Sequence, residues 1–280
     1  MPTLEITTMI GCPLKCTFCP QDKLSASYKG QRALFLEDYK KILGKIPTYV
    51  RIDFSGLSEP WAHRGATDML EYTLSLGYRV AVYTTLQGMR DPERVTALLR
   101  AHADQVEKVV IHLPDDQGNM RGFKKSAKWE ESVREFKLLE DEGKIIHWMA
   151  MGGTTLPVSM EWIGLTRAGN LNQQAIAGQE VEEVPRHESP VCCSFTPFYD
   201  HNVLLPNGDV VLCCMDYSLD HKIGNLLQDD YFDLFESEEM GRLRRRNMKF
   251  EFDTSSLCKS CSRAKLFELR PGINQFWEEK

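Results

Sequence analysis

The chain has 280 residues, of which 42% are hydrophobic and 26% charged, and its formal net charge is −6. These shares are those of an ordinary globular protein, long enough for one large domain with a smaller one attached. The negative balance argues against nucleic-acid binding through general attraction to phosphates. The sequence has neither an apolar run of membrane-spanning length nor a signal peptide. Nine cysteines without a secretion signal indicate reduced thiols and metal ligation in the cytoplasm, rather than disulfides.

The first half of the chain alternates strand and helix patterns. Strands are expected over residues 4–9, 50–55, 78–84, 109–113 and 145–151, and helices over 36–46, 67–76 and 126–141. Another helix is expected to begin at Asp91-Pro92, with the aspartate as N-cap and the proline in the first helical position. Five repeats of this kind predict a complete or partial (β/α) barrel, in which chemistry takes place at the C-terminal ends of the strands.

The second half has a different pattern. Periodicity weakens beyond residue 155, and the polar segment 170–190 carries two prolines, which suggests a linker. A β-hairpin over 202–214 with a Pro-Asn-Gly-Asp turn and a helix over about 231–246 follow. The sequence therefore predicts a partial barrel over residues 1–170, a linker over 171–190 and a small α+β domain over 191–280.

Three cysteines lie directly after the first expected strand, at Cys12, Cys16 and Cys19. Thiolates this close can converge on one soft metal centre, and three of them leave a cubane iron–sulfur cluster one protein ligand short of four. With Phe18 just before the third cysteine, the spacing resembles the signature of the radical S-adenosylmethionine (SAM) enzymes. The alternative is a zinc site, for which a fourth nearby cysteine or histidine is missing.

Six further cysteines lie in the C-terminal module, four of them in a recognisable pattern. Four thiolates close a cluster completely, which suits electron storage rather than an open catalytic iron. The pattern resembles the twitch domain, the smaller relative of the SPASM domain, which holds one auxiliary [4Fe-4S] cluster. The implied ligands are Cys193, Cys213, Cys258 and Cys261. Cys192 is the alternative to Cys193, and a zinc ribbon with four cysteine ligands is the alternative to a cluster.

The resemblance also implies residues that bind SAM at the strand ends. The stretch from Ser55 to Pro60 looks like the Gly-Gly-Glu-Pro segment of the family, where the glutamate meets the methionyl amino group; here Ser58 stands where a glycine is commoner. Phe18 matches the aromatic residue beside the adenine. Strands three and four end in polar residues that match positions for the carboxylate and the ribose, and Met149 suits either the adenine pocket or the core. The implied SAM-binding residues are Phe18, Gly56, Ser58, Glu59, Thr84, His112 and Met149.

Two residues are candidates for contact with the substrate. The segment Thr166–Asn170 is similar to one in 2-deoxy-scyllo-inosamine dehydrogenase, a radical SAM enzyme whose matching arginine contacts the substrate. Arg167 is therefore a catalytic candidate, with a buried structural ion pair as the alternative. That dehydrogenase has a glutamate two residues after a ligand cysteine, where this chain has Met215 followed by Asp216, the second candidate. This departure leaves the substrate and the reaction open.

The resemblance implies an enzyme that cleaves SAM reductively to a 5′-deoxyadenosyl radical, which then abstracts a hydrogen atom from the substrate. The implied cofactors are SAM, a SAM-binding [4Fe-4S] cluster and an auxiliary [4Fe-4S] cluster, with flavodoxin or ferredoxin as electron donor. We expect oxidation of a small polar, carbohydrate-like substrate, because the first strand begins at residue 4 and no upstream domain precedes it to bind a leader peptide. Epimerisation through a spare thiol, maturation of a ribosomal peptide and a non-catalytic zinc protein are the alternatives.

Overall fold

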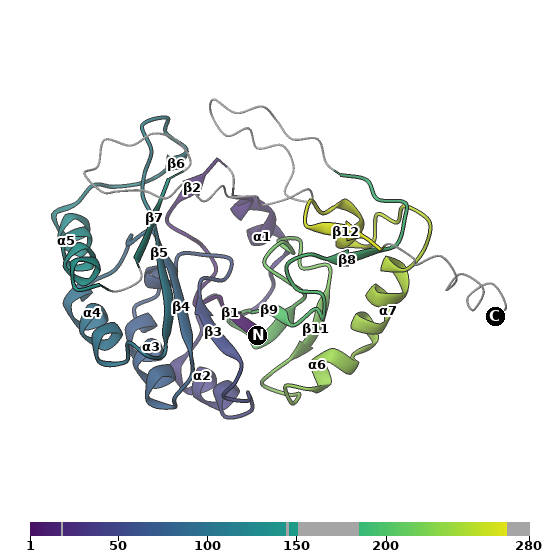
Figure 1. Ribbon diagram of the computed structural model, residues 1–280, viewed down its shortest axis with the longest axis horizontal. Helices are drawn as coiled ribbons and strands as arrows, with labels where there is room; N and C mark the ends of the chain where they lie inside the picture. The colour runs from purple at the N-terminus through teal and green to yellow at the C-terminus, as the bar shows by residue number, and fades with distance from the viewer. Residues whose placement is uncertain (18, 144–145, 151–184, 268–280) are drawn as a thin grey trace.

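The computed structural model describes residues 1–17, 19–143, 146–150 and 185–267 (Figure 1). Its centre is an eight-stranded sheet with the order β11-β10-β9-β1-β3-β4-β5-β7. The five strands expected in the first half all form. They are β1 (Thr3–Ile6), β3 (Arg51–Phe54), β4 (Val80–Thr84), β5 (Val106–His112) and β7 (Ile146–Met149), and each pairs with the next in parallel.

Four helices follow the curved sheet along its outer side (Figure 1). They are α2 (Leu36–Leu43), α3 (Ala66–Ser75), α4 (Pro92–Ala101) and α5 (Ala127–Asp141), and all four were expected. Ser126 caps α5 by accepting a hydrogen bond from the backbone N–H of Trp129 at 3.1 Å. Asp91 precedes α4 but accepts from the hydroxyl of Thr67 instead of a helix N–H. Alternating strands and helices of this kind form a partial (β/α) barrel.

The C-terminal segment extends the same sheet. Strand β9 (His201–Leu204) lies parallel to β1, and β10 (Asp209–Val211) and β11 (Lys222–Asn225) add antiparallel strands outside it. The predicted hairpin is therefore confirmed. Its turn depends on Gly208, which has a φ of 85° and where a Cβ atom would lie 2.7 Å from Leu227 Cγ. The predicted domains thus share one sheet, and the division at residues 170 and 191 stays a prediction.

The expectation of one helix over 231–246 was wrong. The segment forms two helices, α6 (Asp233–Glu236) and α7 (Glu238–Asn247), because Ser237 between them is extended with φ −60° and ψ 152°. Ser237 caps α7 by accepting from the N–H of Met240 at 3.3 Å. Several short elements had no clear sequence pattern: β2 (Lys15–Cys16), α1 (Gln21–Ser27), η1 (Pro60–Ala62), β6 (Met120–Arg121), β8 (Val191–Cys193), η3 (Leu257–Ser260) and β12 (Ala264–Leu266).

Apolar side chains from both halves of the chain form one large core. It joins Leu4 and Ile6 of β1 with residues of the outer helices, and with Leu234 and Leu243 of α6 and α7. This shared core fixes β9 against β1, and it therefore holds the cysteine loop that follows β1 close to the C-terminal segment. Among the described residues, the helices are too short or too polar to cross a membrane. The cytoplasmic location stays a prediction.

Candidate active site

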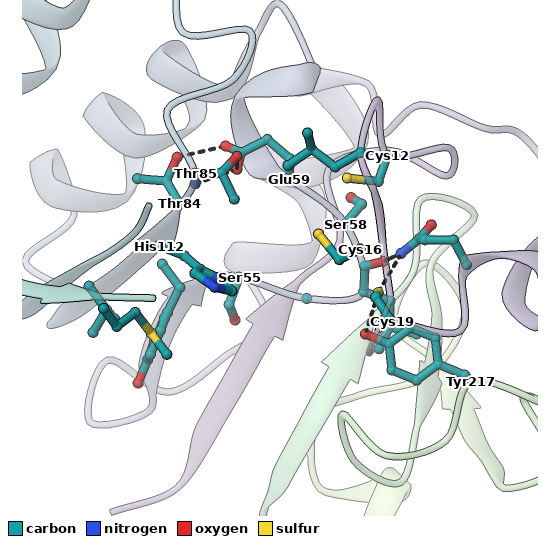
Figure 2. A pocket seen from close by; sticks show the side chains of 17 residues that line it. Cys12, Cys16, Cys19, Ser55, Ser58, Glu59, Thr84, Thr85, His112 and Tyr217 are labelled. Atoms are coloured by element: carbon teal, nitrogen blue, oxygen red, sulfur yellow. Dashed lines mark hydrogen bonds between the residues drawn. The ribbon is translucent and has the colours of Figure 1, made fainter. Parts of the chain in front are cut away.

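The three cysteines of the first motif line one pocket at the C-terminal ends of the parallel strands (Figure 2). The loop that carries them leaves β1 and is held by the short antiparallel pair of β2 and β6, in which Cys16 lies opposite Met120. The N–H of Cys19 donates to the carbonyl of Cys16 at 3.0 Å and closes the turn between these two ligands. The sequence therefore folds locally so that three thiols face one cavity, as the motif predicts.

The thiols of this pocket must lose their protons before they can bind a cluster. Burial raises the pKa of the Cys12 thiol to about 11. A thiolate is the form that binds iron, so cluster assembly must release protons from these groups. Within the described ranges, no three His, Cys, Asp or Glu side chains lie close enough together to hold a single metal ion. The donor set is three sulfurs around an open pocket, which fits an iron–sulfur cluster with one free corner.

The loop after β3 forms the next wall of the pocket. Gly56 has a φ of 55°, and a Cβ atom there would lie 2.5 Å from Thr7 Oγ1, so only glycine fits. Ser58 lines the pocket, and its buried hydroxyl has no hydrogen-bond partner among the described residues. The same holds for the side-chain oxygen of Gln21. Because buried polar atoms are normally hydrogen-bonded, these two fit a polar ligand such as SAM.

Glu59 has a role that the motif alone did not indicate. Its buried carboxylate accepts four hydrogen bonds: from the hydroxyl of Thr84 at 2.7 Å, from the hydroxyl and N–H of Thr85 at 2.6 and 2.7 Å, and from the N–H of Trp61 at 3.2 Å. Burial raises the pKa of Glu59, although these donors oppose the shift. A carboxylate has about four acceptor positions. Glu59 therefore joins the ends of β3 and β4, and its predicted contact with a methionyl ammonium group stays a prediction.

The structure gathers most of the predicted SAM-binding residues around this one pocket. Gly56, Ser58, Glu59, Thr84, His112 and Met149 all line it together with the three cysteines. Figure 2 shows His112 and the two threonines across the pocket from Cys12 and Cys19. Phe18 and Arg167 lie outside the described residues. Their individual roles, like those of the residues in the pocket, stay predictions.

Asp216 was predicted to face the substrate, but the structure does not bring it to the pocket. Its buried carboxylate accepts hydrogen bonds from the N–H groups of Asp220 at 2.9 Å and His221 at 2.8 Å. Burial raises the pKa of this carboxyl. The side chain thus closes the turn between β10 and β11, because both of its oxygens are used by the backbone of that turn.

The pocket also contains residues that sequence reasoning missed. Tyr217 reaches it from the C-terminal segment, with its hydroxyl 3.7 Å from Cys19 Sγ. The amide nitrogen of Gln21 donates to Leu57 O at 2.5 Å and to Cys19 Sγ at 3.5 Å. Ser55 and Tyr83 line the pocket as well. Gln21 directly follows the cysteine motif and was within reach of a local argument, whereas nothing in the sequence near Tyr217 points to Cys19.

The predicted auxiliary ligands lie on β8, after β10, and in and after η3. Burial raises the pKa of Cys258 to about 12, and it also raises the pKa values of Cys213 and Cys261. The thiols of Cys258 and Cys261 lie close enough to Cys193 to feel its charge. Successive strand residues point to opposite faces, so Cys192 and Cys193 face different sides of β8. Only one of the two can therefore face Cys258 and Cys261, and the choice of Cys193 stays a prediction.

Lys259 fixes the loop between the last two of these cysteines. Its side chain is fully buried, and its Nζ donates to the carbonyls of Ser189 at 2.7 Å and Lys249 at 2.6 Å. The N–H of Arg263 donates to Cys261 Sγ at 3.4 Å, and that of Thr196 donates to Cys193 Sγ, also at 3.4 Å. Hydrogen bonds from backbone N–H groups to ligand sulfurs are one of the features that set the reduction potential of an iron–sulfur cluster.

Comparisons with known proteins agree with this geometry. Residues 192–262 match SPASM, an iron–sulfur cluster-binding domain. A search of curated proteins finds no match. Among solved structures, the chain is similar to BtrN in complex with AdoMet and 2-DOIA, with a TM-score of 0.60 and 18% identity over 94% of this chain and 93% of BtrN. It is similar to SuiB of Streptococcus suis, with a TM-score of 0.55 and 15% identity over 92% of this chain and 70% of SuiB.

A third similar structure is anSMEcpe with bound AdoMet, with a TM-score of 0.50 and 14% identity over 93% of this chain and 86% of that one. At these identities the likeness concerns the fold. The fold, the three-cysteine pocket and the match of residues 192–262 to a SPASM iron–sulfur cluster-binding domain together support the class predicted from the sequence, a radical SAM enzyme with a C-terminal iron–sulfur domain of the SPASM type. The cofactors of this class are SAM, the cluster that binds it and an auxiliary cluster.

Proposed function

We propose that the enzyme oxidises an alcohol group of a small polar, carbohydrate-like substrate. The observation that carries the proposal is the composition of the pocket, where three cysteine thiols stand opposite hydroxyl-bearing side chains. Ser55, Ser58, Thr84 and Thr85 all line it. The hydroxyls of Thr84 and Thr85 donate to Glu59, which leaves Ser55 to accept a hydrogen bond from a hydroxyl of a carbohydrate. BtrN, whose structure holds AdoMet and 2-DOIA, is similar over nearly its whole length, which supports a small substrate.

Different residues of this chain would bind the cluster, SAM and the substrate. Cys12, Cys16 and Cys19 would hold the open cluster, and Ser58 and Gln21 offer unpaired oxygens to SAM. When bound, cluster and SAM supply a 5′-deoxyadenosyl radical by one-electron cleavage of the sulfonium. The loops at the strand ends orient the substrate next to that site and exclude water from it.

The C-terminal domain would supply the electron acceptor. Removal of a hydrogen atom from an alcohol carbon leaves one further electron and one proton to be lost before a ketone is formed. Cys193, Cys213, Cys258 and Cys261 offer four thiolates for a fully ligated cluster, which suits electron storage. Cys213 lies two residues after β10, a strand of the same sheet as the strands whose ends form the pocket, so both clusters would be held by one framework.

The test uses oxygen-free protein loaded with iron and sulfide, reduced with dithionite and given SAM. The probes are 2-deoxy-scyllo-inosamine and myo-inositol, and the expected result is 5′-deoxyadenosine and ketone in equal amounts. Cys16→Ala is the control and should form neither. Uptake of solvent deuterium at the substrate carbon without a ketone would instead show an epimerase. Turnover of peptides but of neither alcohol would show a peptide-modifying enzyme.

A further inference from the structure

A chain of three hydrogen-bonded side chains leads from the pocket wall into the sheet. Ser55, just after β3, lines the pocket and donates from its hydroxyl to Glu5 Oε2 at 2.8 Å. The other oxygen of Glu5 lies 2.7 Å from Nε2 of His201 on β9. Strand β1 lies between β3 and β9 in the sheet, so Glu5 lies between its two partners. The three residues come from segments far apart in the sequence and meet only in the folded chain.

The surroundings keep Glu5 ionised. Burial on its own raises the pKa of this carboxyl, but the hydrogen bond and charge of His201 and the hydrogen bonds of Ser55 and Cys214 outweigh it, and the pKa is lowered. An ionised carboxylate only accepts hydrogen bonds, so His201 donates to it through Nε2–H. The other charged or titratable groups around the pair are Asp53 with its partner Arg51, Tyr83 and Cys214.

Stability alone is a weak reason for this pair. Taking a carboxylate and an imidazole out of water costs about as much as their attraction returns. Glu5 is 7% exposed and His201 9%, yet their hydrogen-bonded chain ends at a half-buried hydroxyl in the pocket. Cys214, which bonds to Glu5, is the neighbour of the predicted auxiliary ligand Cys213. A proton that moved from the pocket to Glu5 would therefore move closer to Cys213, one of the residues predicted to hold the electron-accepting cluster.

We propose that Ser55 binds the substrate hydroxyl and passes its proton to Glu5 during oxidation, with His201 as the residue that positions Glu5. This inference rests on the proposed function. Cluster and SAM, when bound, would supply the radical that takes the C–H hydrogen as an atom. The O–H proton then moves to Ser55 Oγ while the Ser55 proton moves to Glu5 Oε2, and a C=O bond replaces the C–O single bond. An auxiliary [4Fe-4S] cluster held by Cys193, Cys213, Cys258 and Cys261 would accept the remaining electron.

The experiment measures the ratio of ketone to 5′-deoxyadenosine. Wild-type enzyme receives 2-deoxy-scyllo-inosamine deuterated at the carbon that is oxidised. It should transfer deuterium to 5′-deoxyadenosine and form one ketone per deoxyadenosine. Ser55→Ala and Glu5→Gln should still transfer deuterium, but the yield of ketone per deoxyadenosine should fall about tenfold or more, since a positioned proton acceptor is missing. Ser55→Thr keeps the hydroxyl and should restore the ratio.

The chain offers a matched control. His221 Nδ1 lies 2.7 Å from Glu239 Oε1 in a second, partly buried pair, and neither residue lines the pocket. Glu239→Gln should leave the ratio of the products unchanged in protein with wild-type iron content. A second readout needs no turnover: calorimetric binding of the same alcohol to oxidised protein with S-adenosylhomocysteine. Ser55→Ala should weaken this binding roughly threefold to tenfold, the effect of one hydrogen bond.

The possible failures differ from one another. A wild-type enzyme that forms ketone, with Ser55→Ala and Glu5→Gln forming as much per deoxyadenosine, would overturn the proton path and leave the proposed function intact. A wild-type enzyme that forms deoxyadenosine without ketone from either alcohol would overturn the proposed function, and the proton path with it. Because Ser55 is half-buried, its alanine and threonine variants decide the question even if Glu5→Gln does not fold.

Discussion

Tyr217 Oη lies 3.7 Å from Cys19 Sγ, so the C-terminal segment touches the cysteine loop directly. The two residues are 198 positions apart in the sequence. Tyr217 is buried, together with Leu57 and Val211, in a small apolar cluster against which Cys19 packs. The contact gives the C-terminal domain a direct influence on the site where SAM would bind.

This contact predicts a change in reduction potential. A hydrogen bond to a ligand sulfur stabilises the more negative, reduced cluster, so Tyr217→Phe should lower the potential of the SAM-binding cluster. A loss of about 1 kcal/mol corresponds to roughly 40 mV for one electron. A redox titration followed by EPR measures the shift. Tyr231→Phe is the matched control, because that buried hydroxyl has no hydrogen-bond partner in the described part of the chain. Equal potentials in all three proteins would contradict the prediction.

The adjacent cysteines predict a sharp difference in iron content. Cys213→Ala should lose the auxiliary cluster and retain roughly half of the iron, whereas Cys214→Ala should retain both clusters. The same comparison between Cys193→Ala and Cys192→Ala tests whether Cys193 or Cys192 on β8 is the cluster ligand. Iron and sulfide analysis of reconstituted protein measures each outcome. If Cys214→Ala lost iron while Cys213→Ala kept it, Cys214 would be the ligand in place of Cys213. The same result for Cys192→Ala and Cys193→Ala would make Cys192 the ligand.

Glu59 should stabilise the fold through its four donors. Glu59→Gln turns one acceptor oxygen into a donor that faces other donors, so the free energy of unfolding should fall by about 2 kcal/mol. Urea denaturation measures this change. Glu37→Gln is the control, since its side chain is 75% exposed and forms only a surface ion pair with Lys40; its effect should stay within about 0.5 kcal/mol. A Glu59 variant as stable as this control would show that the donors find other partners.

The pair of Glu239 and His221 predicts a dependence of stability on pH. Burial raises the pKa of Glu239, but the hydrogen bonds and charges of His221 and Arg242 outweigh it and hold the pKa below the ordinary 4.5. A carboxyl with a lowered pKa contributes stability above its unfolded value and loses it as the pH falls through the folded value. Glu239→Gln should therefore be less stable than wild type at pH 7.

The difference between these two proteins should shrink once the pH falls below about 4.5. Thermal unfolding of anaerobic protein across this range measures it, with iron content checked at each pH. A difference that stayed constant down to the acid limit would show that Glu239 acts by packing and not by its charge.

The sequence by itself determined the order of strands and helices and the position of the cysteine loop. Apolar periodicity and turn residues are local, so they fixed β1, β3, β4, β5 and β7. A loop that directly follows a parallel strand must lie at its C-terminal end. The three thiols, Gly56, Thr84 and His112 could therefore be placed at strand ends from the order of the elements, and the resemblance to the radical SAM family implied that they share one site. The split of the helix at Ser237 was missed, although a serine followed by Glu238 and Glu239 is a typical start of a new helix.

Only the tertiary structure decided which distant residues meet. Nothing in the spacing of the sequence places β9 beside β1, and that pairing brings His201 to Glu5, 196 positions away, and Tyr217 to Cys19. Asp216 is a different case, because its carboxylate accepts from N–H groups only four and five positions away in its own turn. The physical reason is that strand pairing and core packing are long-range: they depend on the whole set of buried side chains, whereas a motif records only its neighbours.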